Sequence, residues 1–106
     1  MIITTTDYVP GFEVVEYKGL ATGEVVAGIN FLKDIGAGLR NVFGGRSAGY
    51  EDELIAARNS ALQELESRAA AMGANAVVGV KITTEGLGQG GNMLLVTVLG
   101  TAVVVR

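Results

Sequence analysis

The pattern of apolar and polar positions predicts an α+β chain in which strands precede and follow one long helix. Runs rich in β-branched and apolar residues are the strand candidates: 2–5, 12–17, 20–29, 76–84 and 93–105. The second and third runs meet at Lys18-Gly19, which could form a tight turn between two strands. Gly19 and Gly23 could equally mark bulges in a single bent strand, which is the interpretation we favour.

The long helix is expected over Tyr50–Met72. The acidic run 51–53 lies where the helix dipole favours negative side chains, and Gly73 follows in the position of a C-terminal capping glycine. Small and apolar residues line one face at helical spacing: Leu54, Ala57, Ala61, Leu65, Ala69 and Met72. This face is therefore predicted to lie close against a sheet.

A second, shorter helix is expected after Asn30, a residue type that is favoured at the N-cap. Apolar residues follow at spacings of four, four and three: Phe31, Ile35, Leu39 and Val42. Gly36 and Gly38 fall inside it, and each costs about 1 kcal/mol relative to alanine. We interpret the segment as a soft helix whose glycines allow a neighbour to pack closely; a ligand-gated hinge is the alternative.

Length and composition indicate one domain that associates with copies of itself. The 106 residues make a single unit, 1–106, of which 18% are charged and 49% hydrophobic, with a mean hydropathy of +0.42. Average proteins have about 25% charged residues. No run approaches the roughly 18 apolar residues of a membrane span, and the first residues do not resemble a signal peptide. We expect a soluble cytoplasmic protein that buries further surface against copies of itself.

The strand 93–105 supports self-association, because it is apolar on both faces. A single helix covers only one face of a sheet. A second subunit is the simplest cover for the other face.

Missing residue types exclude several functions. Without Cys or His there is no thiolate nucleophile, zinc site, catalytic triad or imidazole acid–base group. A net charge of −3 and a pI near 4.8 argue against a nucleic-acid surface. Soft metals prefer thiolate or imidazole, and Glu51, Asp52 and Glu53 fan outward on a helix rather than converge. We therefore expect no catalytic residue, no cofactor and no metal site.

Two glycine-rich segments match nucleotide-binding motifs only in part. Residues 86–91 fit the spacing GxGxxG, but a strand follows where that motif needs a helix, so a hairpin loop is predicted. The segment 44–47 precedes a helix, but Arg40 and Arg46 stand where a phosphate-binding loop needs glycine and lysine. We interpret it as a structural or intersubunit loop in which Arg46 pairs with a carboxylate. An anion site at Arg46 and Ser47 is the alternative.

Arg58 falls inside the apolar stripe of the long helix, between Leu65 and Ala69 on the helical wheel. A guanidinium there must be paired or must reach water. We predict a buried ion pair, within or between subunits, with Glu24, the one charged residue in the apolar run 20–29. Binding of a ligand carboxylate by Arg58 is the alternative.

A set of motifs runs through nearly the whole chain: Ile-Ile-Thr-Thr at the start, Gly23-Glu24, Asn30 with Asp34-Ile35, Gly44-Gly45-Arg46-Ser47, Tyr50-Glu51, Ala57-Arg58, Gly73–Val80 and Gly100–Val103. In this order they resemble the YbjQ-like family of small bacterial and archaeal proteins, described as heavy-metal-binding. The resemblance implies an antiparallel sheet wrapped around one long helix, similar to a dodecin subunit, and a homopentameric ring. It implies no established activity.

Two classes of function follow. The first is a non-catalytic oligomeric binding or scaffold module that holds a small ligand or ion at subunit boundaries. Its candidate ligand or interface residues are Glu24, Arg46, Ser47, Tyr50, Glu51 and Arg58. The second is a metal-binding protein, or a metal- or anion-dependent enzyme that uses Arg46 with Glu51 or Glu24 with Arg58. The composition favours the first class, because an enzyme without His, Cys or convergent acids has few acid–base groups.

Overall fold

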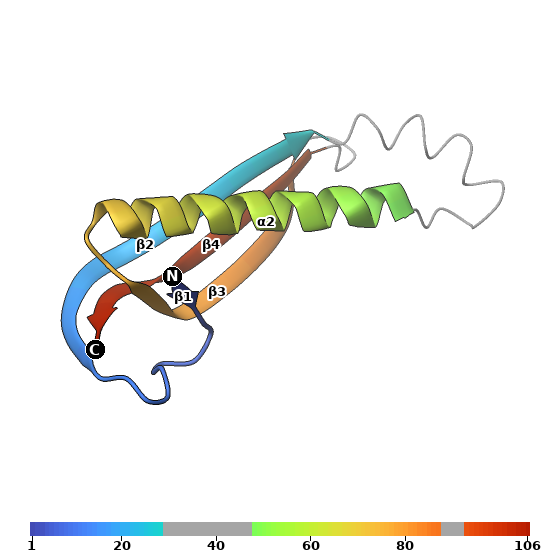
Figure 1. Cartoon of the computed structure of the whole chain (residues 1–106). Helices are drawn as coiled ribbons and strands as arrows, with labels where there is room; N and C mark the ends of the chain where they lie inside the picture. Colours follow the sequence, from blue (N-terminus) through green and yellow to red (C-terminus); the bar gives the residue numbers. More distant parts are fainter. Residues whose placement is uncertain (29–47, 88–92) are drawn as a thin grey trace, which may run out of the picture.

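A computed structural model describes residues 1–28, 48–87 and 93–106. The elements are β1 (Ile2–Ile3), β2 (Val14–Gly28), α2 (Ala48–Ala71), β3 (Ala76–Leu87) and β4 (Met93–Val105). The strands form one sheet in the order β1-β3-β4-β2, and α2 lies across one face of it (Figure 1). The α+β class and the long helix are confirmed. The second helix predicted after Asn30 and the loop 44–47 lie outside the described residues.

The sheet is mixed, whereas an antiparallel sheet was expected. β4 pairs antiparallel with both β2 and β3, as predicted, but β1 runs parallel to β3, with Ile2 beside Ala76 and Ile3 beside Val77. A two-residue strand carries no alternation of side chains that could indicate its direction or its partner. The sequence therefore predicted that a strand was present, but not how it paired.

β2 is the single bent strand that the sequence favoured. Its pairing with β4 shifts register between Val14 and Glu16 and again between Tyr17 and Gly19. Gly19 has a φ of +118°, a conformation that suits glycine, so it marks a bulge as predicted. Gly23 marks no bulge; it lies in regular strand directly under the helix.

β3 and β4 form the predicted hairpin, with Leu87 opposite Met93. The segment that matches GxGxxG is thus part of this hairpin, and its first residues, Gly86 and Leu87, extend β3 beyond the predicted end at Thr84. A strand follows the segment instead of a helix, so it lacks the helix N-terminus that a dinucleotide phosphate requires.

The main core lies between α2 and the sheet. The predicted helix face is confirmed: Ala57, Ala61, Leu65 and Ala69 are buried against apolar residues of β2, β3 and β4. Gly73, with a φ of +87°, follows the helix as the predicted capping glycine. Among the described residues, no helix is both long enough and apolar enough to cross a membrane.

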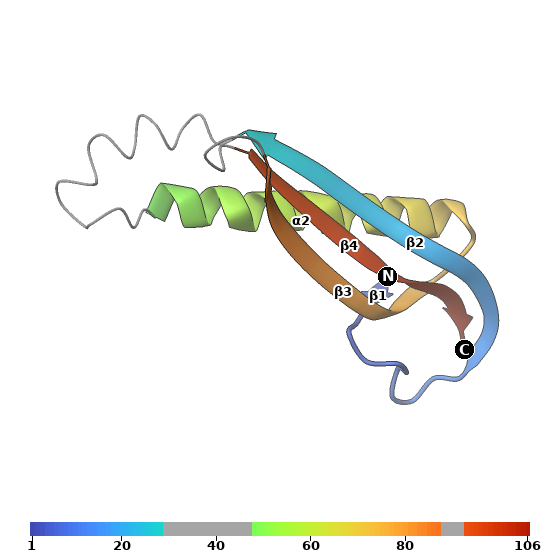
Figure 2. The same ribbon diagram turned by 180° about the vertical axis from the view of Figure 1, so that it is seen from behind.

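The described residues cover the opposite face of the sheet only at one end. There Val9 packs over Ala76, Val78, Val103 and Val105. Figure 2 shows the rest of this face in front of the helix, with no described element crossing it. Large apolar side chains on β2 and β4 are exposed there: Leu20 at 68%, Val26 at 54%, Leu99 at 38% and Met93 at 37%.

Candidate functional site

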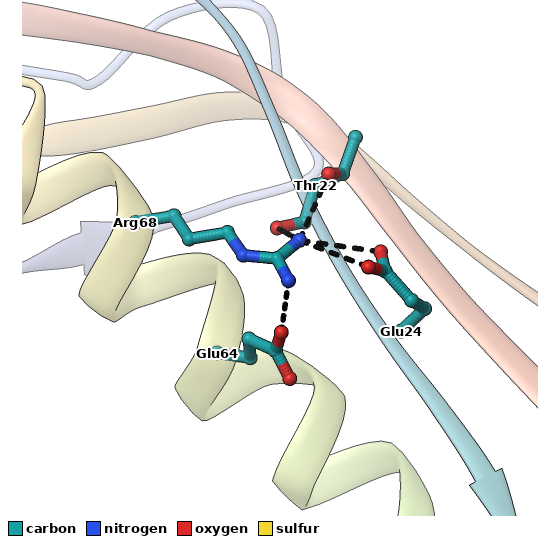
Figure 3. A network of polar contacts seen from close by, with 4 residues as sticks. All are labelled: Thr22, Glu24, Glu64 and Arg68. Atoms are coloured by element: carbon teal, nitrogen blue, oxygen red, sulfur yellow. Dashed lines mark hydrogen bonds and ion pairs between the residues drawn. The ribbon is translucent and has the colours of Figure 1, made fainter.

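The main polar cluster between α2 and the sheet is built around Arg68 (Figure 3). Its Nη1 donates hydrogen bonds to the backbone carbonyl of Thr22 at 3.1 Å and to the Thr22 hydroxyl at 3.2 Å. The same nitrogen donates to both carboxylate oxygens of Glu24, at 3.1 and 3.3 Å. Nη2 donates to the carboxylate of Glu64, one helical turn before Arg68. We call these four residues the Arg68 cluster.

The close approach of α2 to β2 allows Arg68 to reach the sheet edge. A Cβ added at Gly23 would lie 2.2 Å from the carbonyl oxygen of Ala61 and 2.8 Å from the backbone nitrogen of Leu65. Only glycine fits there, so the helix backbone rests directly on the strand. β2 is an edge strand, and from this position a long side chain on the helix can pass around that edge.

The Arg68 cluster is suited to holding two elements together rather than to catalysis. A guanidinium stays protonated in proteins and has no acceptor, so it does not exchange protons at neutral pH. The side chains are partly exposed: 43% for Arg68, 47% for Glu24 and 38% for Glu64. Exposed ion pairs of this kind contribute about 0.2–1 kcal/mol each. The cluster therefore fixes the helix to the edge of the sheet with modest energy.

The predicted pair of Glu24 with Arg58 is wrong within one chain, because Glu24 pairs with Arg68. The physical reason lies in the two flanks of α2. Arg68 lies on the flank that faces β2. Arg58 lies on the other flank, in one helical row with Glu66. The Glu66 carboxylate lies 3.7 Å from the N-terminal amine, beside β1 and β3. Arg58 is half-buried, and no carboxylate lies within ion-pair distance of it in the part of the chain that the structure describes. An intersubunit partner for Arg58 stays a prediction.

The other sequence candidates do not join this cluster. Arg46 and Ser47 lie outside the described residues, and so does the side chain of Tyr50. Glu51 lies in the first turn of α2, where the dipole favours it, and is exposed. Arg68 was not among the residues predicted from the sequence. Its spacing of four from Glu64 was one available signal, but its contact with Thr22 depends on β2 being the edge strand.

The donors present do not fit a heavy metal. The sequence has no Cys or His, and the described segments bring no three acidic side chains together. The two carboxylates that do approach each other, Glu24 and Glu64, share the Arg68 cation, which takes the place that a metal ion would need. The prediction that soft metals are not bound therefore rests on donor chemistry.

Known proteins similar to this chain cover its full length. A family model of the YbjQ type, whose description reads "Putative heavy-metal-binding", matches residues 1–106. The relatives named UPF0145 protein from Acetivibrio thermocellus and Clostridium kluyveri are each 61% identical over 106 residues, covering 100% of both chains. The relative from Listeria welshimeri is 60% identical over 106 residues, 96% of its length.

A solved structure shares the fold. The crystal structure of a protein of unknown function of the DUF74 family, from Pediococcus pentosaceus, matches with a TM-score of 0.57. The match covers 100% of this chain and 98% of that one at 19% identity, which supports a common fold and nothing finer. Because the family model spans every residue and relatives are about 60% identical over full length, the chain belongs to the YbjQ (UPF0145) family.

Proposed function

We propose that the chain is a non-catalytic subunit of a homo-oligomeric ring of five copies, and that it acts as a binding or scaffold module in this assembled form. The observation that carries the proposal is the open apolar end of the sheet face away from α2. Leu20, Val26, Leu99 and Met93 are 37–68% exposed there, and all four lie on the paired strands β2 and β4. Exposed apolar patches of this kind mark interaction sites.

The chemistry of the described surface favours binding over catalysis. In the Arg68 cluster both carboxylates are held by a guanidinium, which has no hydrogen-bond acceptor, and the sequence has no imidazole or thiol. Boundaries between copies are then the places where a small ligand or ion would be held. Arg58 is the candidate best placed for this, since it is half-buried without a carboxylate partner in the described segments.

Native mass spectrometry of the intact protein tests the proposal. The expected spectrum shows a species near five times 10.9 kDa, and any retained ligand adds a discrete mass to that species alone. The same sample in denaturing solvent is the control, because it gives the chain mass without ligand. A native spectrum with only the 10.9 kDa chain would contradict the proposal.

A further inference from the structure

Within residues 1–28, 48–87 and 93–106, the sheet has two edges on which no further strand pairs, and they lie at the same level. β2 forms one outer edge. β3 forms the other beyond Val80, because the N-terminal segment covers β3 only up to that residue, through hydrogen bonds from Val80 to Thr4 and from Gly79 to Thr6. The register through β4 places Thr22 level with Lys81 and Gly28 level with Leu87.

The outward backbone groups of β2 can be identified from Arg68. In an antiparallel strand the N–H and C=O of one residue point to the same side, and successive residues alternate. The Thr22 carbonyl points toward the edge, where Arg68 already donates to it, so the outward backbone groups left for a partner strand are those of Glu24, Val26 and Gly28. Long open edges with apolar side chains pair readily with another strand.

From these edges we infer how copies join, on the premise of the proposed oligomer: the outer edge of β2 of one copy pairs with the β3 edge, Lys81–Leu87, of the next copy. β2 and β3 both run antiparallel to β4, so they are parallel to each other. Rotation about a ring axis keeps strand directions, and the new pair is therefore parallel. Such a contact joins two different surfaces and can repeat around a closed ring, whereas β2 against β2 would stop at a dimer and leave β3 open.

Charges along the two edges fit this contact. Glu24 and Thr83 lie on the same sheet face, because both pair with Thr97 of β4. Val26 and Glu85 share this face, because both pair with Leu95. Lys81, two residues before Thr83 and paired with Leu99, lies on it too. Same-face alignment allows only even shifts between the two strands. A shift of two residues places Glu24 of one copy beside Lys81 of the next.

The flanks of α2 also carry complementary charge. The flank toward β3 has Arg58 and Leu62 in one helical row, and Ile82 on the helix side of β3 is exposed. The flank toward β2 carries Glu64 and, three turns earlier on the same side, Glu53. In the inferred ring each copy contributes three strands, β3, β4 and β2, to a continuous sheet. The helices of neighbouring copies are then about 14 Å apart, the width of three strands. That exceeds the roughly 8–10 Å of direct helix packing, and long Arg and Glu side chains can span it.

Disulfide trapping tests the inference, and the chain is well suited to it because it has no cysteine. Val26→Cys is combined in turn with Lys81→Cys, Thr83→Cys, Glu85→Cys or Leu87→Cys, which samples every same-face position of the open β3 segment. Within one chain β4 separates these positions by about 9–10 Å. That distance is too long for a disulfide, which needs Cα atoms within about 7 Å. Every disulfide therefore joins two copies.

One of the four double variants is expected to give covalent multiples of 10.9 kDa on oxidation, ending at the size of the ring, while each single variant gives none. A Val26→Cys single variant that links to itself would overturn the inference, as would an intact oligomer in which none of the four pairs links. The sedimentation of each unoxidised variant separates the two proposals. An assembled protein that does not link contradicts only the β2–β3 contact, whereas a monomer contradicts the oligomer as well.

Discussion

β2 and β3 flank the same central strand and run in the same direction, yet the helix covers β2 much more than β3. On the helix side of β2, Ala21, Gly23 and Ala27 are buried under α2. On the helix side of β3, Val80 is buried, but Ile82 is 41% exposed. Thr84 and Gly86 follow it and are exposed too. The helix crosses the sheet (Figure 1) but lies mainly against β2 and least against β3, so the described residues leave the β3 side of the sheet largely uncovered.

The difference has a local cause in one glycine. α2 can lie over β2 only because Gly23 has no side chain, and Arg68 then fastens the helix to the same strand. On β3, neither Gly79 nor Gly86 lies against the helix in this way. The described part of the fold therefore fixes its helix at the β2 edge of the sheet.

Gly23→Ala should lower the free energy of unfolding more than any other substitution considered, because the new side chain would push the helix away from β2. The new Cβ meets backbone atoms of Ala61 and Leu65, which cannot swing aside. Overpacking of this kind costs about 3 kcal/mol in the free energy of unfolding. Urea denaturation followed by circular dichroism measures it.

Gly86→Ala is the matched control on β3, since a Cβ there meets nothing within 4 Å. We expect a change within about 0.5 kcal/mol. Equal losses in the two variants would contradict the account of the helix position.

Ile82→Thr should weaken assembly while leaving the fold of the chain intact. Ile82 is exposed in the single chain, and the proposed β2–β3 contact would place a second copy beside it. Losing about 1.4 kcal/mol of this burial weakens association tenfold. Sedimentation velocity over a dilution series measures the shift, and an unchanged far-ultraviolet dichroism spectrum checks the fold. Undiminished assembly would argue that β3 faces no partner.

Arg68→Met should lower the free energy of unfolding by about 1 kcal/mol, since its partners are partly exposed ion pairs. A double-mutant cycle with Glu24→Gln should show coupling, because the two side chains are in contact. The cycle of Glu24→Gln with Arg58→Met serves as the control and should be additive within about 0.5 kcal/mol. Coupling in the second cycle alone would favour the original Glu24–Arg58 pairing, now between copies.

The smallest effect is expected from soft metals. Zinc or copper should bind no more tightly than to an unrelated acidic protein, because the chain has no thiolate or imidazole. Calorimetric titration gives the answer directly. A stoichiometric site with a sub-micromolar Kd would overturn the interpretation of the donor set.

Much of the fold was accessible from local patterns. The period of the helix, the capping Gly73, the bulge at Gly19 and the bounds of β4 all depend on residues near in sequence, and all were predicted. Strand order and the parallel pairing of β1 depend on contacts between distant segments, which periodicity does not encode. Arg68 was missed for the same reason. Its role follows from which strand lies at the edge. The ion pair of Glu24 was predicted with Arg58 instead of Arg68, because the sequence does not show which flank of the helix faces β2.

Sedimentation equilibrium of the unmodified protein at micromolar concentration shows whether further copies of the chain cover the β3 side and the apolar sheet face. We expect a single species of about 55 kDa, five times the chain mass of 10.9 kDa, that persists on dilution. A species of 10.9 kDa alone would contradict it.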